Sequence, residues 1–206
     1  MSHFTSSLAP LLLRALLALS IVFGAPAALA GPLYRVSLDT SALAGAVGYL
    51  DLGLNGPLDA APTVARLGNF SGAFLDGGVL PSSGNVSGDV VNGVVLRNGP
   101  DFNFFEQLVA FGGLFSFDVE FDLGEGVNGT LFSVAFIDDA YHYLGAAGNV
   151  VEMNLVAGEP VALQLVDPAF ASVAEVPEPG AWLLVASGLF LLAATRRPLP
   201  LPLPRR

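Results

Sequence analysis

Hydrophobic and polar residues alternate along much of the middle of the chain. In residues 114–123, every second position is Phe, Val or Leu, and the positions between them are Ser, Asp or Glu. A period of two is typical of a strand with one buried face. The same alternation predicts strands at Leu33–Asp39 and Gly48–Leu54, and further strands are expected near Thr63–Asn69 and Val90–Arg97 and at Val150–Leu155 and Val161–Val166. Leu131–Ile137 is apolar on both faces apart from Ser133, which predicts a central strand.

Glycine, asparagine, aspartate and proline separate these runs at short intervals, and no long stretch has a helical period. We expect one turn of helix at Ser41–Ala46 and a short helix at Asp101–Val109. About seven to nine short strands with glycine-rich turns predict an all-β fold, an antiparallel β-sandwich that is jelly-roll-like, over residues 31–172. Twelve of the 15 Phe lie in residues 31–180, which is enough for a core without disulfides.

The first 30 residues have the pattern of a secretory signal peptide. Arg14 precedes the apolar run Ala15–Gly24, and Ala28 and Ala30 supply the small residues that signal peptidase requires. The apolar run is too short to span a bilayer by itself. We therefore predict export and cleavage after Ala30, with an uncleaved N-terminal anchor as the alternative.

A second apolar run, residues 181–195, lies near the other end and carries no charge. As a helix it would extend about 22 Å, somewhat less than the ~30 Å hydrocarbon core, so we expect a short transmembrane helix. Arg196 and Arg197 follow and favour a cytoplasmic location for this side by the positive-inside rule. The tail, residues 196–206, alternates Leu and Pro between Arg pairs.

A linker, residues 173–180, is expected between the sandwich and this helix, because its prolines resist both helix and sheet. It contains the sequence Val176-Pro177-Glu178-Pro179-Gly180. A Pro-Glu-Pro motif, a short apolar helix and an Arg cluster, in this order near a C-terminus, resemble the PEP-CTERM sorting signal. The resemblance covers about residues 176–197. It implies recognition by an exosortase, a membrane enzyme that uses the motif as its substrate, in a Gram-negative bacterium that makes exopolysaccharide.

Composition excludes several kinds of site. The chain has no Cys and only two His, so disulfides, Cys-ligated zinc and a thiol nucleophile are excluded. Residues 31–180 contain all 18 acidic residues and three Arg, a net charge of −15 with His neutral. Such an acidic surface argues against nucleic acid as a partner and suits a solvated extracellular domain.

A candidate ligand loop follows the apolar run 131–137. Tyrosine side chains with exposed rings are common in sugar sites, and loop carboxylates can bind calcium. The candidate loop comprises Asp138, Asp139, Tyr141, His142 and Tyr143. The alternative is that these residues form a solvated surface loop without a ligand. No metal ligand is assigned. Calcium is the one cofactor considered, and it would need oxygen atoms from this loop. Asp118, Glu120 and Asp122 also share a strand face, but neighbours in this set lie about 6.6 Å apart, too far for all three to bind one ion.

Two other patterns suggest chemistry. Gly124–Gly129 matches the letters of a dinucleotide fingerprint, but a strand rather than a helix follows it, so the glycines are expected to form a hairpin loop with positive φ. Paired carboxylates could support glycoside hydrolysis. The candidates are Glu106, Glu120, Glu125, Glu152 and Glu159.

Together these features favour a non-enzymatic exported protein. It would be anchored in the inner membrane as a precursor, processed by signal peptidase and an exosortase, and would act at the cell surface in the exopolysaccharide or biofilm layer. The alternative is a carbohydrate-binding β-sandwich module, with or without calcium. A polysaccharide-active enzyme is the third hypothesis.

Overall fold

The computed structural model describes residues 31–81, 85–176 and 187–188 of the chain. The predicted signal peptide and nearly all of the predicted membrane helix, 181–195, lie outside these residues; only Ser187 and Gly188 are described there, as helix. No helix in the described ranges is long and apolar enough to cross a membrane. The fold below is that of residues 31–176.

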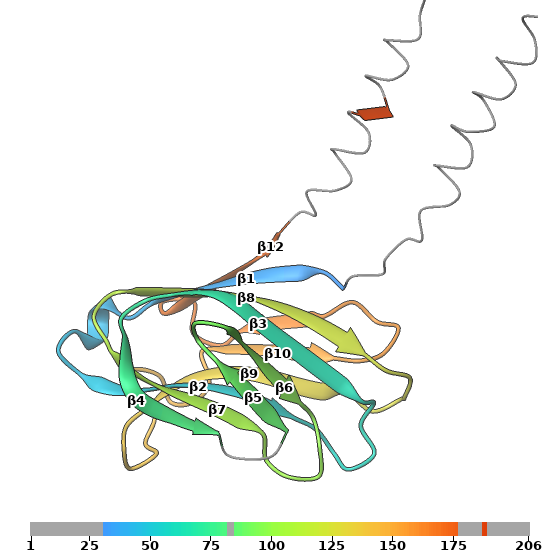
Figure 1. Ribbon diagram of the computed structural model, residues 1–206, viewed down its shortest axis with the longest axis horizontal. Helices are drawn as coiled ribbons and strands as arrows, with labels where there is room; N and C mark the ends of the chain where they lie inside the picture. Colours follow the sequence, from blue (N-terminus) through green and yellow to red (C-terminus); the bar gives the residue numbers. More distant parts are fainter. Residues whose placement is uncertain (1–30, 82–84, 177–186, 189–206) are drawn as a thin grey trace, which may run out of the picture. The chain divides into compact units, whose positions relative to one another are not determined.

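Twelve strands form two six-stranded antiparallel sheets, which Figure 1 shows as two layers. The first sheet has the order β12-β1-β8-β3-β6-β5 and consists of β1 Leu33–Asp39, β3 Thr63–Ser71, β5 Val86–Asp89, β6 Gly93–Arg97, β8 Leu114–Leu123 and β12 Ala171–Val176. The second has the order β11-β10-β9-β2-β7-β4 and consists of β2 Val47–Asn55, β4 Phe74–Pro81, β7 Phe104–Ala110, β9 Thr130–Ile137, β10 Val151–Leu155 and β11 Ala162–Leu165. The all-β prediction with two antiparallel sheets is confirmed.

One hydrophobic core lies between the sheets. The apolar residues of the alternating strands point inward, as in β8, where Phe117 and Val119 are buried. Aromatic rings join the two layers: Phe121 of β8 meets Phe132 of β9 at 5.4 Å, and Phe115 of β8 meets Phe74 of β4 at 5.5 Å. Edge-to-face ring pairs of this kind stabilise a core beyond the area they bury. The sheets are thus held together as a sandwich.

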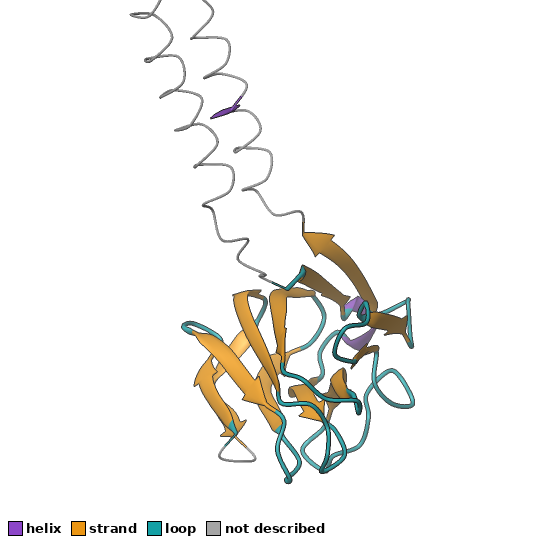
Figure 2. Ribbon diagram, turned by 90° about the vertical axis from the view of Figure 1, so that its right-hand side faces the viewer, coloured by secondary structure: helices purple, strands orange, loops and turns teal. Residues whose placement is uncertain are grey.

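Several strand predictions are confirmed. Strands β1 and β8 have the predicted bounds, and β9 is a central strand between β10 and β2, as its apolar faces indicated. The predicted helical turn is present as the 3₁₀ helix η1, Ser41–Leu43, which Figure 2 distinguishes from strands and loops.

Other predictions are wrong. The sandwich has twelve strands rather than seven to nine, and the helix predicted at Asp101–Val109 is strand β7. The expected linker, residues 173–180, begins too early, because its first four residues belong to β12 and pair with β1. The rest of that linker, 177–180, lies outside the described residues.

The Gly124–Gly129 segment is not a hairpin loop. It joins β8 of one sheet to β9 of the other, and none of its glycines has positive φ. Instead the backbone of residues 60–62 passes close by: a Cβ on Gly126 would lie 2.8 Å from the Ala61 Cβ. Ala60 forms an isolated parallel bridge with Asn128 in the same crossing. These glycines therefore permit a close approach of two chain segments.

Candidate functional site

The predicted ligand loop lies at the end of the sandwich opposite the beginning of the domain. The loop follows Ile137, the last residue of β9, and the neighbouring Phe136 ring packs on Phe170 at 5.9 Å. The Phe170 carbonyl accepts a hydrogen bond from the amide of Asp39, the last residue of β1. By contrast Leu33, at the start of β1, pairs with Val176, the last residue of β12. The loop and the two domain termini thus occupy opposite ends.

Asp138 organises this loop. Its Oδ1 accepts hydrogen bonds from the backbone N–H of Ala140 at 2.9 Å and of His142 at 2.8 Å. Its Oδ2 lies 3.2 Å from Nδ1 of His142. The backbone N–H of His142 is the main reason why the pKa of Asp138 is lowered, and the carboxylate is therefore charged at neutral pH. This is the local turn geometry that Asp favours.

The two tyrosines of the loop are exposed. Tyr141 is 65% exposed and Tyr143 is 51% exposed. Tyr141 has φ 62, a left-handed conformation that non-glycine residues adopt at a cost. The turn around Asp138 therefore holds the exposed Tyr141 ring on a backbone conformation that costs free energy for a residue other than glycine. An exposed ring pair with hydroxyl groups is suited to stacking on a sugar ring and hydrogen bonding to it.

The structure brings the predicted loop residues together but not as a metal cage. Both Asp138 oxygens face hydrogen-bond donors, and Asp139 is exposed beside them. Across residues 31–81, 85–176 and 187–188, no three His, Asp or Glu side chains gather closely enough to hold a metal ion.

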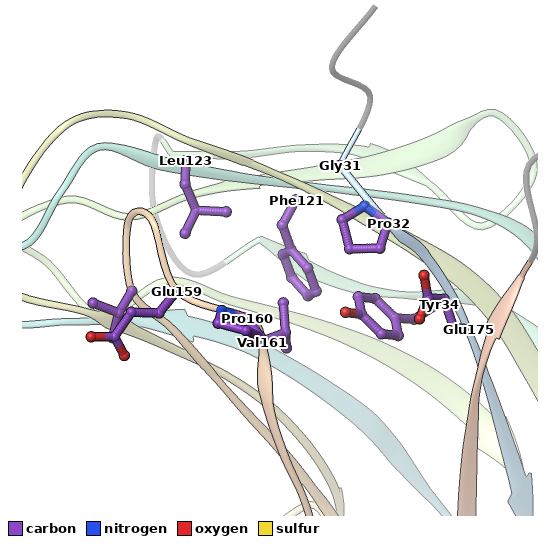
Figure 3. A pocket seen from close by; sticks show the side chains of 10 residues that line it. Gly31, Pro32, Tyr34, Phe121, Leu123, Glu159, Pro160, Val161 and Glu175 are labelled. Carbon is purple, nitrogen blue, oxygen red and sulfur yellow. The ribbon is translucent and has the colours of Figure 1, made fainter.

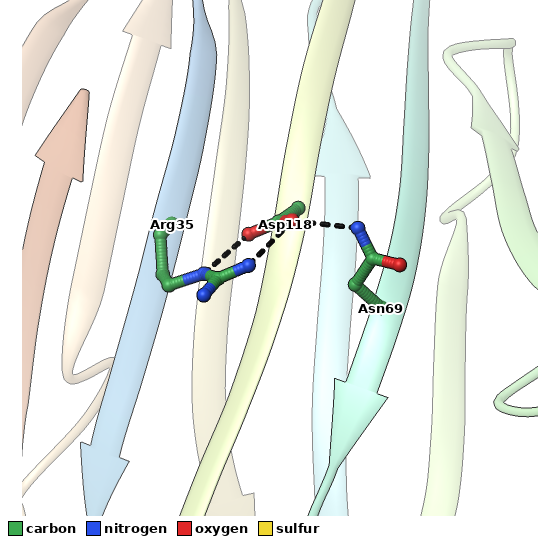
Figure 4. Close-up of polar contacts among 3 residues, drawn as sticks. All are labelled: Arg35, Asn69 and Asp118. Atoms are coloured by element: carbon green, nitrogen blue, oxygen red, sulfur yellow. Dashed lines mark hydrogen bonds and ion pairs between the residues drawn. The ribbon is translucent and has the colours of Figure 1, made fainter. Parts of the chain in front are cut away.

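On the outer face of the first sheet, the acidic strand β8 is neutralised in part by a polar network across three strands. Figure 4 shows Asp118 of β8 between Arg35 of β1 and Asn69 of β3. Arg35 donates to both carboxylate oxygens at 2.7 and 2.8 Å, and Asn69 donates to Oδ2 at 2.8 Å. The hydrogen bond from Arg35 is the largest cause of the lowered pKa of Asp118. A register irregularity between Gly68 and Ser71 directs the Asn69 amide to this carboxylate.

A second pair of carboxylates, Asp51 and Glu106, lies on the outer face of the other sheet, and only Glu106 was among the candidates expected from the sequence. Asp51 of β2 stands directly opposite Glu106 of β7. Glu106 is 7% exposed, and Oδ1 of Asp51 is buried with no hydrogen-bond partner among the described residues. Burial first, and then the charge of Glu106, raise the pKa of Asp51 to about 7, and burial raises the pKa of Glu106 as well. Among the described residues no basic side chain forms an ion pair with either.

The other glutamates proposed as catalytic pairs are not brought together. Glu120 stands opposite Arg66, Glu125 is exposed in the β8–β9 connection, and Glu152 accepts a hydrogen bond from Asn149 at 2.8 Å. Asp51 and Glu106 are neighbours on one face of a sheet. The two carboxylates of a glycosidase instead flank the substrate from opposite sides of a cleft.

A cavity of about 510 Å³ opens at the end of the sandwich where the domain begins. Figure 3 shows Pro32, Tyr34 and Phe121 along it, with Glu159 and Glu175 at its sides. Its lining residues include no basic side chain. Burial, followed by the charge of Glu175, raises the pKa of Tyr34, so the phenol stays neutral at physiological pH. The cavity is large enough for a small ligand.

The sorting residues fall largely outside the described residues. Val176 is described, as the last residue of β12. The remaining sorting residues, the predicted stop-transfer residues and the predicted signal-cleavage residues are not: Pro177, Glu178, Pro179, Gly180, Arg196, Arg197, Ala28 and Ala30.

Comparison with known proteins identifies no relative. No protein-family model, no curated protein and no solved structure matches the chain.

Proposed function

We propose that this protein is a non-enzymatic, exported protein of the cell surface or extracellular matrix. A signal peptide would deliver it, the C-terminal helix would hold the precursor in the inner membrane, and an exosortase would process it at Val176-Pro177-Glu178-Pro179-Gly180. The domain would then act in the exopolysaccharide or biofilm layer. A jelly-roll-like sandwich is the proposed fold family.

The arrangement of the domain ends carries this proposal. Leu33 pairs with Val176, so the segment after the predicted signal cleavage and the segment before the Pro-Glu-Pro motif meet at one end. The exposed Tyr141 and Tyr143 lie at the other end. A domain tethered through its termini would therefore present these rings away from the membrane.

Strand order supports the jelly-roll assignment. An eight-stranded jelly roll has two four-stranded sheets formed by two Greek keys. The first eight strands occupy the two sheets as β1-β8-β3-β6-β5 and β2-β7-β4, so that successive strands lie in opposite sheets except β5 and β6; β12 extends the first sheet and β9–β11 extend the second.

The test is the intact mass and location of the protein in its native host. We expect a chain that starts at Gly31 and ends within residues 176–181, at the cell surface. The variant Pro177-Glu178-Pro179→Ala-Ala-Ala should stay unprocessed in the membrane fraction, whereas the matched control Pro198-Leu199-Pro200→Ala-Ala-Ala should be processed like the wild type. Unchanged surface delivery of the first variant would contradict the proposal.

A second function, binding of a neutral sugar unit by the Asp138–Tyr143 loop, is favoured by the left-handed conformation of exposed Tyr141. A glycan array with and without calcium tests it. We expect binding that Tyr141→Ala abolishes and that the control Phe102→Ala retains, because Phe102 is also exposed, 76% against 65% for Tyr141, but lies outside this loop. Silence on the array in both conditions would reject sugar binding.

A further inference from the structure

No spacer separates the folded domain from the sorting motif. Val176, the first residue of the motif, is still paired with Leu33 in the β1–β12 ladder, and Pro177 is the next residue. The preceding pair in the ladder is Tyr34 with Glu175. An enzyme that binds the chain around Pro177–Pro179 would therefore meet residues that are part of a sheet.

Strand β12 is an edge strand of its sheet and lies beside β1. Among the described strands it pairs only with β1, whereas β1 also pairs with β8. Of its six side chains only Ala171 is buried; Val173 is partly buried against the core, and Ser172, Ala174 and Glu175 are exposed. Segments with few buried apolar contacts open locally at a lower free energy than the core.

We propose that β12 detaches from β1 before the exosortase acts, so that opening of this edge strand sets the rate of processing. The inference rests on the sorting function proposed above. Cleavage of a chain beside a folded domain proceeds from the locally open state and follows its population when opening and closing are fast. Pairing of β12 thereby delays release until the strand opens.

A disulfide across the ladder tests this inference. The natural chain has no Cys, so one introduced pair gives one crosslink in the oxidising space outside the inner membrane. Tyr34→Cys with Glu175→Cys joins two directly opposite residues one step before the motif, and directly opposite strand positions are within disulfide reach. The matched control, Glu152→Cys with Gln164→Cys, joins β10 to β11 in the same way, away from the motif.

The assay is pulse–chase of the full-length precursor in an exosortase-containing host, with and without a membrane-permeant reductant. We expect the Tyr34–Glu175 crosslink to slow processing at least tenfold and the reductant to restore it. The control crosslink should leave the rate unchanged. Conversely, Val173→Ala, which removes a partly buried contact of β12, should speed processing severalfold.

A second crosslink guards against misfolding of the first. Ser37→Cys with Ser172→Cys changes two nearly isosteric side chains in the same ladder and should also slow processing. Processing at the wild-type rate with a formed crosslink at either position of this ladder would overturn the inference while leaving the sorting function intact. Absence of processing in the wild type would overturn both.

Discussion

The buried carboxyl pair on β2 and β7 gives the sharpest prediction of pH-dependent stability. Asp51 and Glu106 stand opposite each other, and in the part of the chain that the structure describes, the buried Oδ1 of Asp51 has no hydrogen-bond partner. Asp51→Asn removes one of the two negative charges and keeps the shape of the side chain. The introduced amide can donate a hydrogen bond to Glu106, so we expect the variant to be more stable than the wild type at alkaline pH.

The magnitude follows from the pKa of Asp51, which is raised from 3.8 to about 7. Between these values the folded protein keeps a proton that the unfolded chain has released. The wild-type free energy of unfolding therefore falls as the pH rises from about 4 to about 7, and levels off above that. At 1.36 kcal/mol per pKa unit the ceiling is about 4 kcal/mol. We therefore expect the free energy of unfolding of Asp51→Asn, measured relative to the wild type at the same pH, to increase by about 2–4 kcal/mol as the pH rises from about 4 to about 8.

Urea denaturation followed by Phe and Tyr fluorescence or far-UV circular dichroism, at about pH 4, 6 and 8, measures this difference. Glu106→Gln should change stability in the same direction. The control Asp122→Asn removes an exposed carboxyl on β8 and should change stability by less than about 0.5 kcal/mol. A variant that is destabilised equally at all three pH values would refute the reasoning, because it would mean that the carboxyl is stabilised as an anion.

Three further predictions concern stability. Asp118→Asn should lower the free energy of unfolding by about 1–2 kcal/mol at neutral pH, because hydrogen bonds to a charged group are lost. Since the pKa of Asp118 is lowered, this difference should shrink as the pH falls below about 4, which denaturation at neutral pH and below about pH 4 checks. Gly126→Ala should cost about 1–3 kcal/mol, because its Cβ would lie 2.9 Å from the Ala61 Cα; Gly113→Ala, which meets nothing within 4 Å, is the control, and equal melting temperatures would count against it. Tyr141→Gly should stabilise the domain by about 0.5–1 kcal/mol by removing left-handed strain at an exposed position, and a lower melting temperature would contradict this.

The strands that the sequence predicted best are those whose two faces differ in environment. Strand β8 has a core face and a polar face, so alternation defined both of its ends. The failure at β7 has a physical cause. Phe104, Phe105, Leu108 and Val109 have helical spacing, and Gln107 breaks the alternation because its buried amide donates to the Leu75 carbonyl of the neighbouring strand. That partner is far away in the sequence.

The candidate sites show the same division. The Asp138–Tyr143 loop was found because tyrosines and carboxylates follow one another directly in the sequence. The Asp51–Glu106 pair was not, since Asp51 occupies the polar position of an ordinary Leu-Asp-Leu alternation. Its burial arises only when β7, which follows much later in the chain, pairs with β2. Strand β12 was missed because an edge strand buries little and its sequence needs few apolar residues.

The location of Gly31 and Val176 at one end has a chemical consequence. Every basic residue of the chain is Arg, so the chain has no lysine amine. In a form cut after Ala30, the α-amino group of Gly31 would be the single primary amine, two residues from Leu33 and its partner Val176. Amine-reactive coupling would then attach every molecule to a bead or sensor surface through the same point. All copies would face solution with the Tyr141 end, an oriented array obtained without an engineered tag.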